Sequence, residues 1–204
     1  MDYTFEAEKR TSPLENFEWD EVWWEQLNSG VGKRIVYIGD SISCGTRRIA
    51  TAVSENKYLF DGFGTSKAID NPFLIPSLSL FLAQMKEYSA VLFNNGLHGW
   101  HLNEEDYCKY YKEVIIALKE MINAPLFILL STDNQKHPGI NDRILQRNAG
   151  VRKIAEELEL PVIDLYEVAI EYNNLHSDDK VHFTRDGYTK IAEKILKTLE
   201  ENNI

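Results

Sequence analysis

Short apolar segments alternate with segments of helical periodicity along most of this chain, and this alternation constrains its fold more than any other feature. The apolar segments are rich in Val, Ile, Leu and Phe, which is typical of strands buried on both faces of a sheet. They cover residues 34–38, 58–63, 90–93, 126–130 and 161–165. Apolar residues spaced as on one face of a helix lie at 72–85, 111–122, 151–158 and 188–199.

This order predicts an α/β protein with a doubly wound, five-stranded parallel sheet covered by helices on both faces. It is a three-layer α/β/α sandwich of the flavodoxin-like type. The length of 204 residues suits one such domain. Ligands of these sheets bind beyond the carboxyl ends of the strands. Functional side chains are therefore expected in the segments that directly follow the strands.

The first 30 residues differ from the rest and predict an N-terminal aromatic and acidic extension, with the main domain over residues 31–204. Trp19, Trp23 and Trp24 lie in this extension. Large aromatic side chains bury much area when they pack on a neighbouring surface. We expect the extension to pack on the domain; an interface or a lid over a substrate pocket is the alternative.

The charge of the chain limits its partners. It has 22 Lys and Arg against 32 Asp and Glu, a formal net charge of −10, so neither nucleic acid nor an anionic membrane surface is an expected partner. No apolar run approaches the roughly 18 residues of a membrane helix, and the first residues do not resemble a signal peptide. Cys44 and Cys108 have no paired spacing. These features predict a cytoplasmic protein.

Two segments at predicted strand ends carry residues suited to nucleophilic catalysis. Gly39-Asp40-Ser41 follows the first strand, where a serine hydroxyl lies at the mouth of the sheet and its amide at the positive end of the next helix. A helix-capping serine is the structural alternative. Asp179 and His182 follow the fifth strand, three residues apart. On a turn, this spacing lets a carboxylate orient an imidazole base.

Further polar and aromatic side chains follow the third and fourth strands. They lie where ligands bind in such a sheet, and we expect them to contact a substrate. These residues are Asn94, Asn95, Trp100, His101 and Arg143.

Together these segments resemble the sequence blocks of the SGNH hydrolases, also called GDSL esterases and lipases. Gly39-Asp40-Ser41 matches the first block, Gly64 corresponds to the glycine of the second, and Asp179 with His182 matches the last. The blocks follow the family's order over about residues 34–200. The resemblance implies a small-molecule acyl ester as substrate. It implies a Ser-His-Asp triad that cleaves this carboxylic ester, such as a short acyl or acetyl-sugar ester, through an acyl-enzyme. It implies no cofactor and no metal.

The third block departs from the family pattern. Gly96-Leu97-His98-Gly99 replaces the usual Gly-x-Asn-Asp, so His98 stands where the family has the asparagine of its oxyanion hole. An imidazole N–H also donates hydrogen bonds. The resemblance therefore implies an oxyanion hole of the Ser41 and Gly64 amides and the His98 side chain, with Asn94 or Asn95 as alternative donors.

Other functions stay open on the sequence. His98 and His101 have a spacing that suits a metal-dependent hydrolase. The hydroxyls of Ser41, Ser43 and Thr46 at a helix start suit the phosphate of flavin mononucleotide. A non-catalytic member of the same fold would bind acyl-sugars without cleaving them, and an acyltransferase would share the acyl-enzyme. The oligomeric state is not determined by the sequence.

Overall fold

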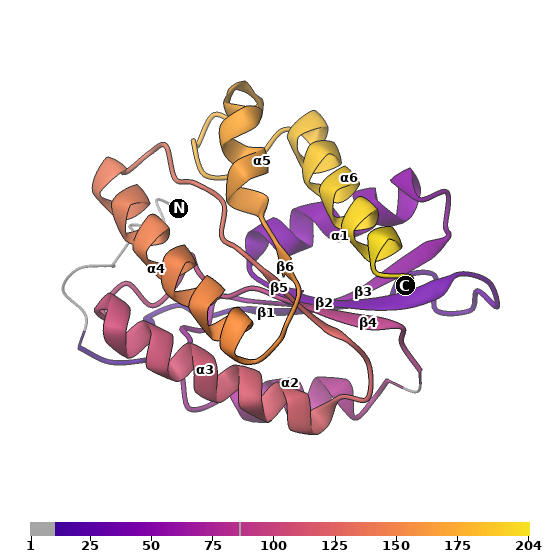
Figure 1. Ribbon diagram of the computed structural model, residues 1–204, viewed down its shortest axis with the longest axis horizontal. Helices are drawn as coiled ribbons and strands as arrows, with labels where there is room; N and C mark the ends of the chain where they lie inside the picture. Colours follow the sequence, from indigo (N-terminus) through magenta and orange to yellow (C-terminus); the bar gives the residue numbers. More distant parts are fainter. Residues whose placement is uncertain (1–10, 86) are drawn as a thin grey trace.

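The computed structural model describes residues 11–85 and 87–204 and confirms the predicted three-layer α/β/α class (Figure 1). Its strands are β1 (Asp20–Trp23), β2 (Lys33–Gly39), β3 (Tyr58–Thr65), β4 (Ala90–Phe93), β5 (Leu126–Leu129) and β6 (Val162–Ile163). Its helices are α1 (Ser41–Val53), α2 (Leu74–Leu82), α3 (Glu104–Met121), α4 (Pro138–Glu157), α5 (Leu165–Glu171) and α6 (Arg185–Glu201), with a 3-10 turn at Asn173–Leu175.

The sheet has the order β1-β3-β2-β4-β5-β6. Strands β2 to β6 are parallel to one another and have the flavodoxin-like order. Strand β1 pairs antiparallel with β3 at the edge, so the sheet has six strands and not the five expected. The sequence did not predict β1, because Asp20–Trp23 has no apolar run: three of its four residues are exposed.

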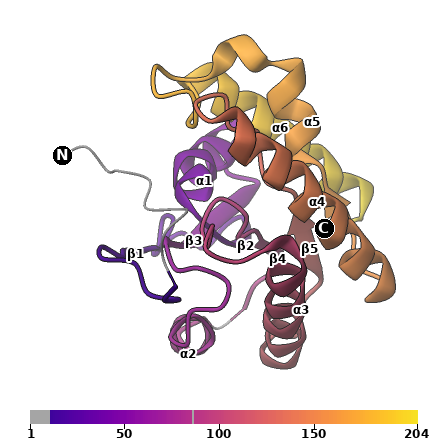
Figure 2. The same ribbon diagram turned by 90° about the vertical axis from the view of Figure 1, so that its left-hand side faces the viewer.

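Helices cover both faces of the sheet. Figures 1 and 2 show α1, α5 and α6 on one side and α2 and α3 on the other, with α4 beside α3. The central strand β2 serves both cores: Ile35 and Tyr37 face the first group of helices, and Val36 and Ile38 face the second. All four side chains are buried, which explains the continuous apolar run in the sequence.

The end of the sheet differs from the prediction at 161–165. Strand β6 has two residues, and α5 begins at Leu165. The carboxylate of Asp164 accepts a hydrogen bond from the Glu167 amide at 2.9 Å and caps this helix. An acidic cap with Glu three residues on is a helix-start pattern, and here it ends the strand early. Thr184 caps α6 as expected, with the Gly187 amide 3.3 Å from its hydroxyl oxygen.

Residues 11–30 run along the edge of the sheet next to β3. Arg47 of α1 passes over Gly62 of β3 to pair with Glu21 of β1. Lys67 Nζ lies 2.6 Å from the carboxylate of Asp20, which is also in β1. The Trp24 ring stacks on a phenylalanine of α2. Residues 1–10, which belong to the predicted extension, lie outside the described residues. No helix in the described ranges is long and apolar enough to cross a lipid bilayer.

The contact between α1 and α6 generates a stability prediction. A methyl group on Gly45 of α1 would overlap the Tyr188 ring of α6. We expect Gly45→Ala to lower the free energy of unfolding by about 1–3 kcal/mol because of this overlap. At a helical site with free space, replacing glycine by alanine instead raises the free energy of unfolding by about 1 kcal/mol. Gly139→Ala in α4 is the control, because nothing lies within 4 Å of its added methyl. Urea unfolding of both variants checks this, and an equal gain in stability would contradict it.

Candidate active site

Ser41 is the first residue of α1, directly after the central strand. The helix cap is Asp40, whose Oδ1 accepts a hydrogen bond from the Ile42 amide at 2.9 Å. The Ser43 hydroxyl donates to the Asp40 carbonyl, and the Thr46 hydroxyl donates to the Ile42 carbonyl, each at 2.7 Å. The helix itself thus uses the hydroxyls of Ser43 and Thr46. The capping role considered for Ser41 belongs to Asp40.

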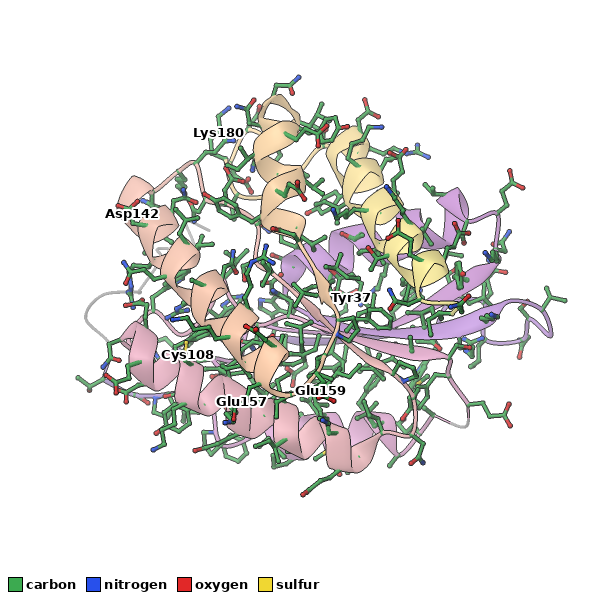
Figure 3. The ribbon with its side chains drawn as sticks, viewed as in Figure 1. Tyr37, Cys108, Asp142, Glu157, Glu159 and Lys180 are labelled. Carbon is green, nitrogen blue, oxygen red and sulfur yellow. The ribbon has the colours of Figure 1, made fainter. Side chains whose placement is uncertain are left out.

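The loop between the 3-10 turn and α6 brings an imidazole to Ser41. His182 Nε2 lies 2.7 Å from Ser41 Oγ, and its Nδ1 lies 2.6 Å from Asp179 Oδ2. Lys180, labelled in Figure 3, marks this loop at the upper edge of the molecule. The structure therefore brings together the serine, histidine and aspartate expected from the sequence, in the arrangement that a nucleophile, its base and an orienting acid would require.

Asp179 is held in its ionised form by hydrogen bonds. Partial burial opposes its charge, but the His182 imidazole, the amides of Val181 and His182 and the Ser177 hydroxyl outweigh it, so the pKa of Asp179 lies well below its usual range. The amides of Val181 and His182 donate to Oδ1 at 3.0 and 2.9 Å. A charged carboxylate beside Nδ1 favours the His182 tautomer with its proton on that nitrogen, so that Nε2 is the ring nitrogen that faces the Ser41 hydroxyl as an acceptor.

A second pair of a carboxylate and an imidazole lies at the base of the loop that carries Asp179 and His182. His176 Nε2 lies 2.8 Å from Asp133 Oδ1, and both side chains are almost wholly buried. The His176 ring packs on Phe183 with ring centroids 4.3 Å apart, and the two residues form a β-bridge across the base of the loop. The sequence does not reveal this pair, because Asp133 and His176 are far apart along the chain and belong to no common motif.

Asp40 has the opposite environment from Asp179. It is buried, and burial raises its pKa, while the nearby imidazoles of His98 and His182 act in the other direction. Its Oδ2 has no hydrogen-bond partner among residues 11–85 and 87–204 and adjoins a small cavity lined in part by Tyr37, labelled in Figure 3, and Thr132. Asp40 therefore lies close enough to both imidazoles for their charges to affect its pKa.

The asparagines after β4 hold the backbone. Asn94 Nδ2 donates to the Leu129 carbonyl at 2.8 Å and to the Ser131 hydroxyl at 3.1 Å. Asn95 Nδ2 donates to the Lys67 carbonyl at 2.9 Å. Both side chains are buried. The sequence predicted substrate contacts for them, but buried backbone carbonyls need donors, and these amides supply them.

The aromatic and basic residues expected to contact substrate also lie against the protein. Trp100 is buried in the core next to α4. Arg143 Nη1 donates to the Trp100 carbonyl at 2.8 Å, and its Nε pairs with Glu104 at 2.6 Å. His101 Nε2 lies 2.8 Å from Asp70 Oδ2. These side chains hold the loop after β4 in place, which differs from the substrate contacts that the sequence suggested.

His98 and His101, considered together as metal ligands, have different neighbours in the structure. Its Nδ1 is 3.8 Å from Glu15 Oε1, and its side chain is 21% exposed, whereas His101 is engaged with Asp70. Within the described part of the chain, no group of three or more His, Cys, Asp or Glu residues is arranged to hold a metal ion. His98 therefore lies next to the segment of Glu15, and no metal site is formed with His101 among the described residues.

Gly64 takes a different orientation from the one expected. It lies within β3, opposite Glu21 of β1. The Ser66 amide donates to the Trp19 carbonyl at 3.1 Å in the same register. In antiparallel strands every second pair of opposite residues is hydrogen-bonded. Gly64 and Glu21 lie two residues along from Ser66 and Trp19, so they also form a hydrogen-bonded pair. The Gly64 amide thus faces β1, whereas Ser41 follows β2 on the other side of β3. The unpredicted strand β1 explains the difference.

No protein-family model matches the chain, and no curated protein matches it either. Solved structures do. A lipolytic G-D-S-L family protein from Veillonella parvula is 18% identical, with a TM-score of 0.67 over 83% of this chain and 99% of that one. The catalytic domain of peptidoglycan O-acetyltransferase A from Streptococcus pneumoniae is 17% identical, with a TM-score of 0.61 over 84% and 95%. An acetyl xylan esterase is 17% identical, with a TM-score of 0.63 over 81% and 99%.

The buried pair below the loop generates a second stability prediction. Asp133→Ala removes the carboxylate that contacts a buried imidazole, and we expect it to lower the free energy of unfolding by about 1–3 kcal/mol, the cost of a buried polar group left without its partner. Asp142→Ala is the control, because Asp142 is exposed on α4 (Figure 3), and such surface changes stay within about 0.5 kcal/mol. Urea unfolding measures both. Equal small effects would show that the pair does not support the loop.

Proposed function

We propose that this protein, whose fold is that of the GDSL lipolytic structures, is a carboxylic ester hydrolase with Ser41 as its nucleophile. One observation carries the proposal: Ser41 Oγ, His182 and Asp179 form a continuous hydrogen-bonded chain of 2.7 and 2.6 Å. A serine is a weak nucleophile unless a base takes its proton. His182 provides that base at Nε2, and Asp179 orients the imidazole through Nδ1.

Acylation follows from this arrangement. Ser41 Oγ attacks the ester carbonyl carbon while its proton moves to His182 Nε2. The bond from the carbonyl carbon to the leaving oxygen then breaks, and His182 returns the proton to the leaving alcohol. Water resolves the acyl-enzyme by the same route in reverse: His182 takes a proton from the water, and Ser41 regains a proton when the acid leaves. Asp179 stays ionised and stabilises the imidazolium throughout.

Two groups are proposed to face the oxyanion. The Ser41 amide is the first N–H of α1, where the helix has partial positive charge. The His98 side chain is the second proposed donor, because it stands where the resembled family has its oxyanion asparagine and because both His98 and His182 lie close enough to Asp40 to affect its pKa. Gly64 is not part of this proposal, because its amide faces β1.

A short acyl or acetyl-sugar ester is the proposed substrate class. Two observations favour it over nucleic acid or an anionic lipid surface. The net charge of −10 repels polyanions, and the matching folds include an acetyl xylan esterase and a peptidoglycan O-acetyltransferase. A transferase would use the same acyl-enzyme and differ in the hydroxyl that resolves it.

The direct test is covalent labelling with a fluorophosphonate, followed by intact mass. Such a probe reacts with a serine that has an adjacent base and an oxyanion hole. We expect one adduct on the wild type, mapped to Ser41, and none on Ser41→Ala or His182→Ala. Ser43→Ala is the matched control and should still be labelled, because the Ser43 hydroxyl is engaged in α1. A folded wild type that forms no adduct would overturn the hydrolase proposal in favour of a non-catalytic binder.

The oxyanion role of His98 makes a separate kinetic prediction. We expect His98→Ala to lower kcat about a hundredfold with KM little changed, because a single oxyanion donor contributes about 3 kcal/mol to the barrier. His98→Asn restores a neutral donor and should retain more activity. Turnover of a p-nitrophenyl acetate ester across pH measures both. A wild-type rate that falls at high pH while His98→Asn stays flat would show that His98 donates as the imidazolium. Unchanged kcat in folded His98→Ala would remove it from the site.

A further inference from the structure

Arg147 of α4 is buried against the loop that carries His98. Its side chain is 1% exposed. Nη1 donates to the His98 carbonyl at 2.7 Å and to the Gly96 carbonyl at 3.3 Å, and Nη2 donates to the Gly99 carbonyl at 2.8 Å. One guanidinium thus binds the backbone on both sides of His98 and at His98 itself.

Two aromatic rings enclose the same guanidinium. Its central carbon lies 4.2 Å from the Trp100 ring centroid and 4.1 Å from that of Tyr107. Glu104 Oε1 lies 3.8 Å from Nε. Burial lowers the pKa of Arg147 to about 10, so the side chain is still charged at neutral pH. The rings and carbonyls offset part of the cost of burying this charge.

The loop backbone is confined on its other sides as well. Gly96 lies against the Ser131 side chain, with no room for a methyl group. Gly99 has a φ of +71°, and a Cβ there would lie 3.0 Å from Ala68. Both positions therefore accept glycine alone without strain. Residues 96–99 lie outside the strands and helices, so Arg147 supplies to their carbonyls the N–H donors that a strand ladder or helix would otherwise provide.

We propose that Arg147 is a positioning residue that holds the His98 imidazole in the oxyanion site by binding the carbonyls of residues 96, 98 and 99. The inference rests on the proposed function of His98. Arg147 need not touch substrate, because its effect passes through the backbone of the loop. A displacement of about 1 Å in a catalytic group costs up to about a hundredfold in rate. Lysine keeps the charge but has no planar fork to serve several carbonyls at once.

A double-mutant cycle tests this coupling. We expect Arg147→Lys to lower kcat tenfold or more in the wild type, with KM little changed, and to lower it less than twofold in the His98→Ala background. Arg152→Lys on the same helix is the matched control, because Arg152 is half exposed and pairs with Asp164; its kcat should equal that of the wild type. Equal losses in both backgrounds, or no loss in the wild type, would overturn the proposal.

Hydrogen exchange tests the same contact without any activity. Mass spectrometry should show faster exchange of the amides at 97–101 in Arg147→Lys and no change at 177–183, which Arg147 does not contact. This result stands or fails even if fluorophosphonate labelling rejects the hydrolase proposal. Unchanged exchange at 97–101 would overturn the proposal that Arg147 holds this loop. If Arg147→Lys does not fold, Trp100→Phe removes part of the aromatic enclosure, and the same non-additivity with His98→Ala is expected.

Discussion

The burial of β2 between β3 and β4 sets the geometry of the site. Because all three strands are parallel, their carboxyl ends meet at one edge, and the register pairs Gly39 with Gly64 and Ile38 with Phe93. The segments that begin with Ser41, Ser66 and Asn94 therefore leave the sheet side by side. A shift of one residue would move the side chains of β2 from one core to the other. The two apolar cores thus hold β2, and with it the segment that begins with Ser41, in register.

The surroundings of two carboxylates of the site shift their pKa values in opposite directions. Asp179 is half exposed, and its charge is stabilised by donors from its own loop. Asp40 is buried with few donors, so ionisation is opposed there. The loop that carries Asp179 needs support from elsewhere, since it has no strand of its own. The buried His176–Asp133 pair and the cap of α6 at Thr184 provide it.

The residues after β4 show why polar side chains at strand ends are ambiguous in sequence. A buried loop must satisfy its own carbonyl and amide groups. Asn94, Asn95 and Arg143 donate to backbone carbonyls, and Trp100 packs on Arg147. Composition alone cannot separate these uses from substrate contacts, because the same donors serve both. The proposed site is consequently smaller than the set of polar residues at the edge of the sheet.

The sequence by itself determined the parallel α/β order. Continuous apolar runs indicate strands buried on both faces, and apolar residues at helical spacing indicate helices buried on one face. It also predicted the meeting of Ser41, Asp179 and His182, because Gly-Asp-Ser and Asp-x-x-His follow strands that end at the same edge. Tertiary structure alone decided the sixth strand, the direction of the Gly64 amide and the place of Arg147. Each depends on a partner far away in the chain: β1 on β3, Gly64 on Glu21, and Arg147 on the carbonyls around His98. Such pairings leave no local pattern, because the energy that selects them comes from contacts formed after the sheet has assembled.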